Sequence, residues 1–239
     1  MRHVTRSLDT IMTTVITPVA MMLLFVYVLG GAIRTGQGTG SYIDYMLPGI
    51  LLITIASGTA YTAFRLFADI RSGIVERFAA MPIARSAMLW AHVLTSLVAN
   101  LLSLVVGVAV ALLMGFRSPA GPGAWLAVAA ILALFTLALT WLAVIPAMTA
   151  HSVDGASAFS YPLIFLPFIS SAFVPTATMP GPVRWFAENQ PVTPIVDTIR
   201  NLFSGAPVGH AIWSALGWMT GLLVLALAAA TLIHRHRSR

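Results

Sequence analysis

The sequence predicts an all-α integral membrane protein with six transmembrane helices. Hydrophobic residues fill 59% of the 239 positions, and the mean hydropathy is +0.91. Only 8% of the residues are charged, whereas an ordinary soluble domain carries about a quarter. The apolar residues also fall in uninterrupted runs, and roughly 20 helical residues suffice to cross a hydrocarbon core of about 30 Å. The bilayer is therefore the expected solvent.

Six segments have the length and composition of a span. The first follows Arg2 and Arg6, as a signal peptide would, but its apolar run is longer than the core of a signal peptide, so we expect a retained helix. The loops between the spans are short and leave no room for a separate soluble domain. The chain 1–239 is thus expected to form a single transmembrane domain, with spans at 10–30, 46–67, 87–116, 124–149, 156–174 and 211–233.

The distribution of arginine predicts the orientation in the membrane. Six spans place both termini on one side, and nine of the 13 basic residues fall on that side against four on the other. The excess of positive charge in cytoplasmic loops then places both termini in the cytoplasm of a multi-pass protein of the cell membrane. Because topology accounts for the pI near 10.8, no nucleic-acid partner is expected.

Two missing residue types exclude several chemistries. Every basic residue is an arginine, so the chain has no lysine to complete a Walker A phosphate loop. It has no cysteine for a disulfide, a thiolate nucleophile or a cysteine-ligated metal. A membrane hydrolase built on Ser157 near His151 is disfavoured, because the surrounding run lacks the second glycine of a nucleophile elbow. We expect no catalytic, cofactor or metal site, and no enzymatic activity on this chain.

The loop 68–86, which faces the cytoplasm in this topology, has the pattern of a short amphipathic helix. Ile70, Ile74, Phe78 and Met81 recur at helical spacing, and Pro82 would end the helix. The segment is too short and too charged to span the membrane. Two interpretations stay open: an interfacial helix that only links two spans, or a docking helix for a cytoplasmic partner.

The loop 175–210 is the longest loop and lies on the opposite side. Prolines punctuate it, and the stretches 183–188 and 195–203 between them can form short helices. Asp197 and Arg200 are three residues apart in the second stretch and are expected to pair. With Trp185 and Trp213 as interface anchors, the loop either folds into the outer leaflet or forms an external lid.

Within the spans, ionisable side chains are scarce. No carboxylate falls near a midplane, which disfavours ion-coupled transport, and His92 is expected to make a helix–helix hydrogen bond. Aromatic residues gather in the second and fifth spans, where Pro162 and Pro167 can break or bend the fifth. These side chains either face lipid and core or form an apolar path for a hydrophobic cargo; the candidates are Tyr61, Phe64, Phe159, Tyr161, Phe165 and Phe168.

Two blocks of the sequence resemble a known family. The first runs through 45–51, then Asp69, Gly73, 76–77 and 81–85; the second comprises 170–175, 179–180 and 189–200. The two blocks, in this order and with six spans around them, resemble the permease subunits of ABC-2 type exporters, particularly those of the bacterial daunorubicin-resistance-like branch.

The resemblance implies a permease that works as a homodimer in membrane lipid, with two copies of a separate ATPase subunit that binds ATP and magnesium. The expected function is export of a hydrophobic or amphipathic compound, such as a drug, an antibiotic or a lipid-like molecule. The alternative is a self-contained six-span carrier or pore without an ATPase. The 68–86 loop becomes the helix that couples to the ATPase, with the candidate residues Asp69, Arg71, Gly73, Ile74, Glu76, Arg77, Phe78, Pro82 and Arg85.

Overall fold

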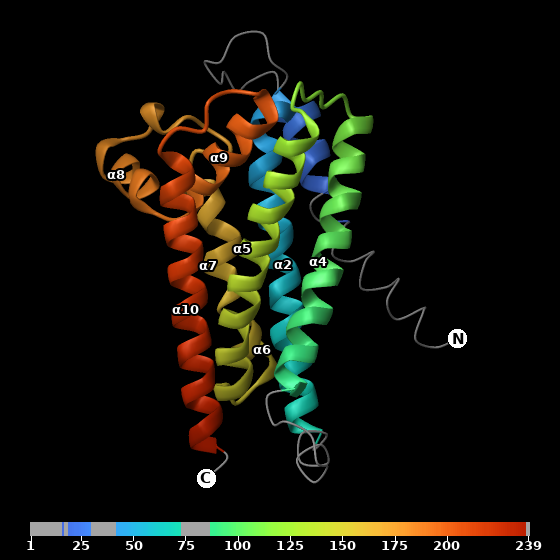
Figure 1. Cartoon of the computed structure of the whole chain (residues 1–239), viewed down its shortest axis with the longest axis vertical. Helices are drawn as coiled ribbons and strands as arrows, with labels where there is room; N and C mark the ends of the chain where they lie inside the picture. Colours follow the sequence, from blue (N-terminus) through green and yellow to red (C-terminus); the bar gives the residue numbers. More distant parts are fainter. Residues whose placement is uncertain (1–15, 17–18, 30–41, 73–86, 238–239) are drawn as a thin grey trace.

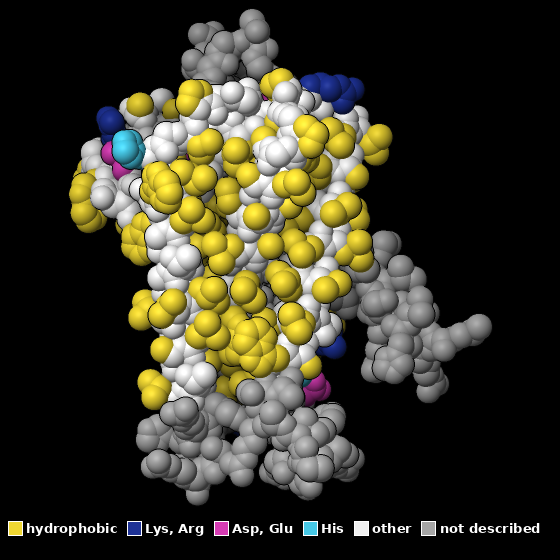
Figure 2. All heavy atoms as spheres, viewed as in Figure 1, with side chains coloured by type: hydrophobic (Ala, Val, Ile, Leu, Met, Phe, Trp, Pro, Cys, Tyr) yellow, Lys and Arg dark blue, Asp and Glu magenta, His cyan; other side chains and the backbone are white. Residues whose placement is uncertain are grey.

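The computed structural model describes residues 16, 19–29, 42–72 and 87–237, and every regular element in these ranges is helical. Four long helices run side by side along the long axis of the molecule (Figure 1). All four are long and apolar enough to cross a membrane. Hydrophobic side chains cover the middle of the face in Figure 2, while charged side chains lie toward its two ends. The four helices are α2 (Tyr42–Arg71), α4 (Ala87–Leu113), α5 (Pro122–Thr149) and α10 (Ala211–Arg237).

The shorter helices connect α5 to α10. From the end of α5 the chain returns along the bundle through α6 (Val153–Ser157), α7 (Ser160–Phe165) and the 3-10 turn η2 (Leu166–Ile169). It then forms η3 (Thr176–Thr178), α8 (Gly181–Asn189) and α9 (Val192–Ser204) before α10 begins. The end of the bundle that carries α9 is called the α9 end, and the opposite end, where α2 terminates, is called the Asp69 end.

The second expected span is confirmed as a helix but is longer than expected. α2 starts at Tyr42 and continues to Arg71 without interruption. No glycine or proline follows Gly58 until Gly73, so nothing in the sequence stops the helix at Phe67. Asp69 and Arg71, expected in a loop, therefore lie in the last turn of α2. The expected coupling helix that follows falls largely on residues 73–86, outside the described part of the chain.

The fifth expected span is not one continuous helix. Its helical run is divided into α6, α7 and η2. Pro162 lies near the start of α7, and Pro167 is the second residue of the 3-10 turn; both positions tolerate a residue without a backbone N–H. The first expected span is described only at residue 16 and from residue 19 to 29, where it ends in the π-helical stretch η1 (Leu24–Leu29). The count of six spans stays a prediction.

Burial differs sharply between the four long helices. In the most apolar window of α2, 67% of the residues are buried, whereas in α10 only 17% are. α2 is thus the central helix, packed against α4, α5, α6, α7 and α9. α10 turns most of its surface outward, which for an apolar spanning helix means toward lipid.

A turn of the chain crosses α2 closely next to Pro48. A Cβ atom placed on Gly49 would lie 2.7 Å from the Cβ atom of Ala172, so only glycine fits there without displacing the turn. The hydroxyl of Tyr42 donates to the carbonyl of Phe173 at 3.1 Å and fixes the same crossing. The segment before α8 is therefore held against the start of α2.

Candidate functional site

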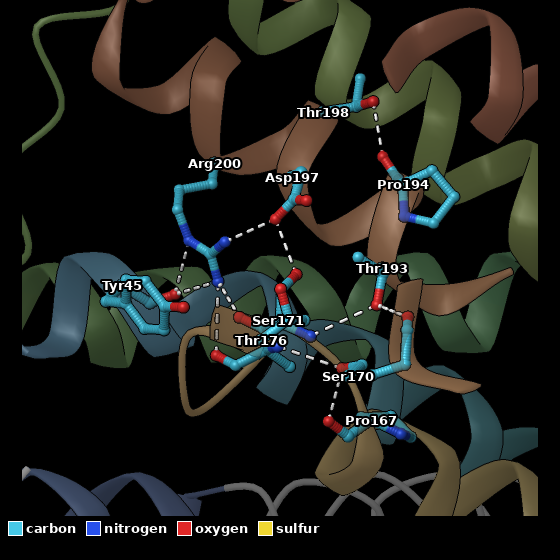
Figure 3. A network of polar contacts seen from close by, with 12 residues as sticks. Tyr45, Pro167, Ser170, Ser171, Thr176, Thr193, Pro194, Asp197, Thr198 and Arg200 are labelled. Atoms are coloured by element: carbon cyan, nitrogen blue, oxygen red, sulfur yellow. Dashed lines mark hydrogen bonds and ion pairs between the residues drawn. The ribbon is translucent and has the colours of Figure 1, made fainter. Parts of the chain in front are cut away.

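A largely buried arginine joins three separate segments at the α9 end. Arg200, on α9, donates through Nη1 to Asp197 Oδ1 at 2.7 Å and through Nη2 to the carbonyl of Ser171 at 2.7 Å. Its Nε and Nη2 also donate to the carbonyl of Tyr45, at 3.2 and 3.1 Å. The guanidinium lies over the Tyr45 ring, 3.8 Å from its centroid. Figure 3 shows these contacts converging on one side chain.

Asp197 serves both the arginine and the neighbouring turn. The hydroxyl of Ser171 donates to Asp197 Oδ1 at 2.6 Å, so one carboxylate oxygen accepts two hydrogen bonds. Burial lowers the pKa of Arg200 below its ordinary value, an effect opposed by Tyr45 and Asp197; the guanidinium stays charged at neutral pH because arginine starts from so high a pKa. The expected pairing of Asp197 with Arg200 is confirmed.

The helix α9 is positioned by an apolar face. Val192, Ile195, Val196, Ile199 and Phe203 are all buried, and α9 packs against α2, α5 and α10. At its end, Gly205 adopts a φ of +69°, where its N–H and that of Ala206 close the last turn. α9 is thus an integral part of the bundle and not a lid lying over it.

A second polar cluster lies at the Asp69 end. His92 Nε2 of α4 and Asp69 Oδ2 of α2 are 3.2 Å apart, which confirms the helix–helix contact expected for His92. Arg71 Nη2 donates to the carbonyl of His151 at 3.3 Å. The guanidinium carbon of Arg71 lies over the Phe67 ring, 5.3 Å from its centroid. The last turn of α2 is therefore linked both to α4 and to the loop after α5.

Most of the candidate coupling residues cannot be placed in this cluster. Asp69 and Arg71 take part in it. The other candidates lie outside the described residues, so their role stays a prediction; they are Gly73, Ile74, Glu76, Arg77, Phe78, Pro82 and Arg85.

The aromatic candidates for a cargo path divide into two groups. Tyr61 and Phe64, on α2, are 39% and 38% exposed, and Tyr161 and Phe165, on α7, are each 61% exposed. Tyr61 and Phe64 stack with centroids 6.0 Å apart. Because α7 packs against α2, these four side chains belong to neighbouring helices; together they are called the aromatic surface.

The other two candidates are half-buried and pack against the apolar core. Phe168 stacks on Phe173 with centroids 4.9 Å apart, and Phe173 stacks in turn on Phe25 at 4.8 Å. Phe159 packs against the apolar core at the Asp69 end. The ring centroids of Phe165 and Phe168 are 6.3 Å apart, so Phe165 connects the aromatic surface to this aromatic stack.

The structure also contains a buried polar contact that the sequence did not indicate. The hydroxyls of Thr62 on α2 and Ser96 on α4 share a hydrogen bond of 2.5 Å. Asn100 donates to the carbonyl of Ser96 at 3.0 Å, while its Oδ1 faces Gly58 and accepts no hydrogen bond from the described residues. The only trace of this contact in the sequence is a glycine on one expected span and an asparagine on the next. Neither residue is informative alone, because both occur in many membrane helices.

The described residues were also compared with the metal and serine sites considered from the sequence. No group of three or more His, Asp or Glu side chains in this part of the chain is arranged to hold a metal ion. The hydroxyl of Ser157 donates to the carbonyl of Val153 at 2.9 Å, as expected for a serine in a helix.

Comparison with known proteins gives one family and consistent relatives. The family model described as "ABC-2 type transporter" matches residues 1–204. The chain is 28% identical to the daunorubicin resistance ABC transporter permease protein DrrB1 of Streptomyces coeruleorubidus, over 80% of this chain and 67% of that protein. It is 26% identical to the probable doxorubicin resistance ABC transporter permease protein DrrC of Mycobacterium tuberculosis (strain CDC 1551 / Oshkosh), over 98% of this chain and 84% of the relative.

Proposed function

The chain belongs to the ABC-2 type transporter family, and from this membership we propose that it is the permease subunit of an ATP-driven exporter for a hydrophobic or amphipathic compound. The relatives are named for resistance to daunorubicin and doxorubicin, which favours a drug or antibiotic as cargo. The four helices long enough to cross a membrane provide the transmembrane part.

The aromatic surface is the structural observation that supports the proposed class of cargo. Four aromatic rings on α2 and α7 are exposed on a chain that otherwise buries the middle of α2. Aromatic faces bind flat apolar molecules by stacking and attract cationic groups through their π-electrons. An amphipathic cargo with a ring system would therefore find partners there that an aliphatic surface lacks.

The energy source lies on another chain in this proposal. The absence of lysine supports an ATP and magnesium site on a separate ATPase subunit, present in two copies. A second copy of the permease would face the first across the aromatic surface and complete the path. With both termini in the cytoplasm, the Asp69 end and the 68–86 segment face the ATPase.

Coupling would pass through the last turn of α2. The 3.2 Å contact between Asp69 and His92 and the bond from Arg71 to the His151 carbonyl connect this turn to α4 and to the loop after α5. A push on the segment that follows Arg71 would thus be transmitted along α2 itself, to α4 and to the loop after α5. Glu76 and Arg77 would fix the register of the docking segment on the ATPase.

The experiment uses reconstituted permease with its ATPase subunit. Glu76→Ala and Arg77→Ala should leave membrane insertion intact while separating ATP hydrolysis from cargo export; Arg184→Ala, an exposed position at the α9 end, is the matched control. Normal ATP-driven efflux in both coupling variants would refute the proposed docking. Cargo movement in vesicles that hold the permease alone would favour a self-contained carrier instead.

A further inference from the structure

An exposed arginine lies beside the aromatic surface. Arg65 is on α2, one turn after Tyr61 and directly after Phe64. Its guanidinium carbon lies over the Tyr61 ring, 5.9 Å from the centroid. Arg65 precedes Arg71, the last residue of α2, by about 9 Å along a helix that rises 1.5 Å per residue. A positive charge is therefore placed inside an apolar spanning helix, and its guanidinium lies toward the middle of the bundle, away from the Asp69 end.

No described carboxylate neutralises this arginine. Asp69 is four residues after Arg65, the spacing at which helical side chains can pair, but its Oδ2 lies 3.2 Å from His92 Nε2 on α4. Asp154, in the first turn of α6, forms no ion pair with Arg65 either. A charge in an apolar span is costly unless it is paired or reaches a polar group. Within the described part of the chain, the positive charge of Arg65 is therefore available to an anionic partner.

The contact with Tyr61 determines which charge the surface accepts. A cation over an aromatic ring is attracted by the π-electrons of the ring, and at Tyr61 that position is already taken by Arg65. A second cation at the same ring would be repelled by the arginine. An anion would instead be attracted, because the planar guanidinium can donate two hydrogen bonds to a carboxylate or a phosphate. The rings of Phe64, Tyr161 and Phe165 are uncharged and exposed, so they can stack on the apolar part of the same molecule.

We infer that Arg65 and the aromatic surface form one binding site for an amphipathic molecule with an anionic head. The carboxylate or phosphate of the head lies on Arg65, and the ring system lies against the aromatic side chains. The inference rests on the proposed function and narrows the cargo to compounds of this class, against those whose head is an amine. An anionic phospholipid shares the head but has no ring system for four aromatic side chains to stack on, so the proposed occupant is the cargo.

Two fluorescent probes of opposite charge test this site. Pyrenebutyrate and pyrenebutylamine have the same ring system on a chain of the same length, with an anionic head in the first and a cationic head in the second. Each probe is titrated against the full chain in nanodiscs of phosphatidylcholine, without an ATPase subunit, and empty nanodiscs correct for partition into lipid. Energy transfer from the tryptophans of the protein to pyrene measures binding.

Three variants separate the charge of Arg65 from other effects. Arg65→Gln removes the charge from an exposed position and keeps a polar side chain of intermediate length. Arg65→Lys keeps the charge. Arg184→Gln removes an exposed arginine at the opposite end of the bundle and is the matched control.

The wild-type chain should bind pyrenebutyrate about tenfold more tightly than pyrenebutylamine, the ratio expected from a hydrogen bond between charged groups. Arg65→Gln should abolish this preference, Arg65→Lys should keep most of it, and Arg184→Gln should leave it unchanged. Equal binding of the two probes by the wild type, or a preference that survives in Arg65→Gln, would overturn the inference.

A second arm distinguishes cargo from lipid. Adding phosphatidylglycerol to the nanodiscs should leave the ratio of pyrenebutyrate affinities between the wild type and Arg65→Gln unchanged. If the anionic lipid removes this ratio, a phospholipid occupies Arg65 and the inference is overturned. Because these measurements use no ATPase, loss of the charge preference would refute the site and leave ATP-driven export intact, whereas failure of export would refute the proposed function alone.

Discussion

The guanidinium of Arg200 lies 3.8 Å from the centroid of the Tyr45 ring and also donates to the carbonyl of the same residue. The two residues are 155 positions apart in the sequence. One tyrosine thus holds the arginine by both its ring and its backbone, one turn before Pro48 in α2. Because Arg200 is also bonded to Ser171 and Asp197, α2, α9 and the turn before α8 form one unit at the α9 end.

Replacing Arg200 should destabilise this unit. The loss of stability should be larger when the new side chain keeps fewer of the hydrogen bonds and less of the stacking on Tyr45. Arg200→Ala removes the hydrogen bonds that the guanidinium donates to Asp197, Tyr45 and Ser171, and should cost about 2–3 kcal/mol, because hydrogen bonds to a charged group contribute about 1.5–3 kcal/mol. Arg200→Lys keeps the charge but removes the planar fork and the stacking on Tyr45, and should cost about 1–2 kcal/mol. Thermal unfolding of the detergent-solubilised chain, followed by tryptophan fluorescence, measures both.

The matched control is Arg184→Ala, which removes an arginine from an exposed i,i+4 pair. Pairs of this kind contribute little, so the apparent Tm should not change measurably. Equal Tm values for Arg200→Lys and the wild type would show that charge alone, without the fork and the stacking, accounts for the role of Arg200.

The contact of Gly58 with Asn100 predicts a second, independent effect. A Cβ atom on Gly58 would lie 2.8 Å from Asn100 Cγ, so Gly58→Ala should force α2 and α4 apart and cost about 1–3 kcal/mol. Asn100→Ala should provide the missing space, so the double variant should be more stable than the sum of the two single changes predicts.

Gly217→Ala is the control for this pair, because nothing lies within 4 Å of a Cβ placed there. The same substitution should be neutral or slightly stabilising at that position, since alanine favours a helix by up to about 1 kcal/mol over glycine. If Gly58→Ala is as harmless as Gly217→Ala, the close approach of α2 to α4 is not a feature of the folded chain.

The contact between Asp69 and His92 should matter more for coupling than for stability. The pair is partly exposed, so Asp69→Asn should lower the stability by no more than about 1 kcal/mol. Under the proposed function it should reduce cargo-stimulated ATP hydrolysis by the permease–ATPase complex several-fold, because the carboxylate that contacts His92 of α4 is then replaced by a neutral amide. Asp154→Asn, an exposed carboxylate on α6, should leave the rate unchanged. A rate for Asp69→Asn equal to that of Asp154→Asn would remove Asp69 from the coupling path.

Local spacing predicted the short helices around α8 and α9 and the pairing of Asp197 with Arg200, because residues three apart on a helix are neighbours. Tyr45 and Ser171 belong to two separate blocks of the resemblance to the ABC-2 family, but nothing in their spacing indicates that they meet at Arg200. That meeting depends on how α9 packs against α2, which is a tertiary property. Proline likewise indicated a weak point in the fifth expected span without giving the bounds of α6, α7 and η2.

The division of the aromatic candidates could not be predicted for a different reason. Lipid tails are as apolar as leucine, so a side chain that faces lipid has the same composition as one that faces the core. Tyr161 and Phe168 lie on the same apolar run, yet one is exposed and the other packs into an aromatic stack. Only the structure separates residues that can touch a cargo from residues that support the bundle.

Acid should free the exposed side of α8 locally by neutralising Glu188, without a measurable loss of overall stability. The hydrogen bond from Arg184 holds the pKa of the Glu188 carboxyl below its ordinary value of 4.5. The contribution of the pair to folding is therefore fully present above pH 4.5 and is lost as the pH falls through the lowered pKa. A spin label at Phe186→Cys should give the same spectrum from pH 7 to pH 5 and a more mobile one in stronger acid. Adding Glu188→Gln should abolish this acid step; a step that persists there would have to come from another carboxylate.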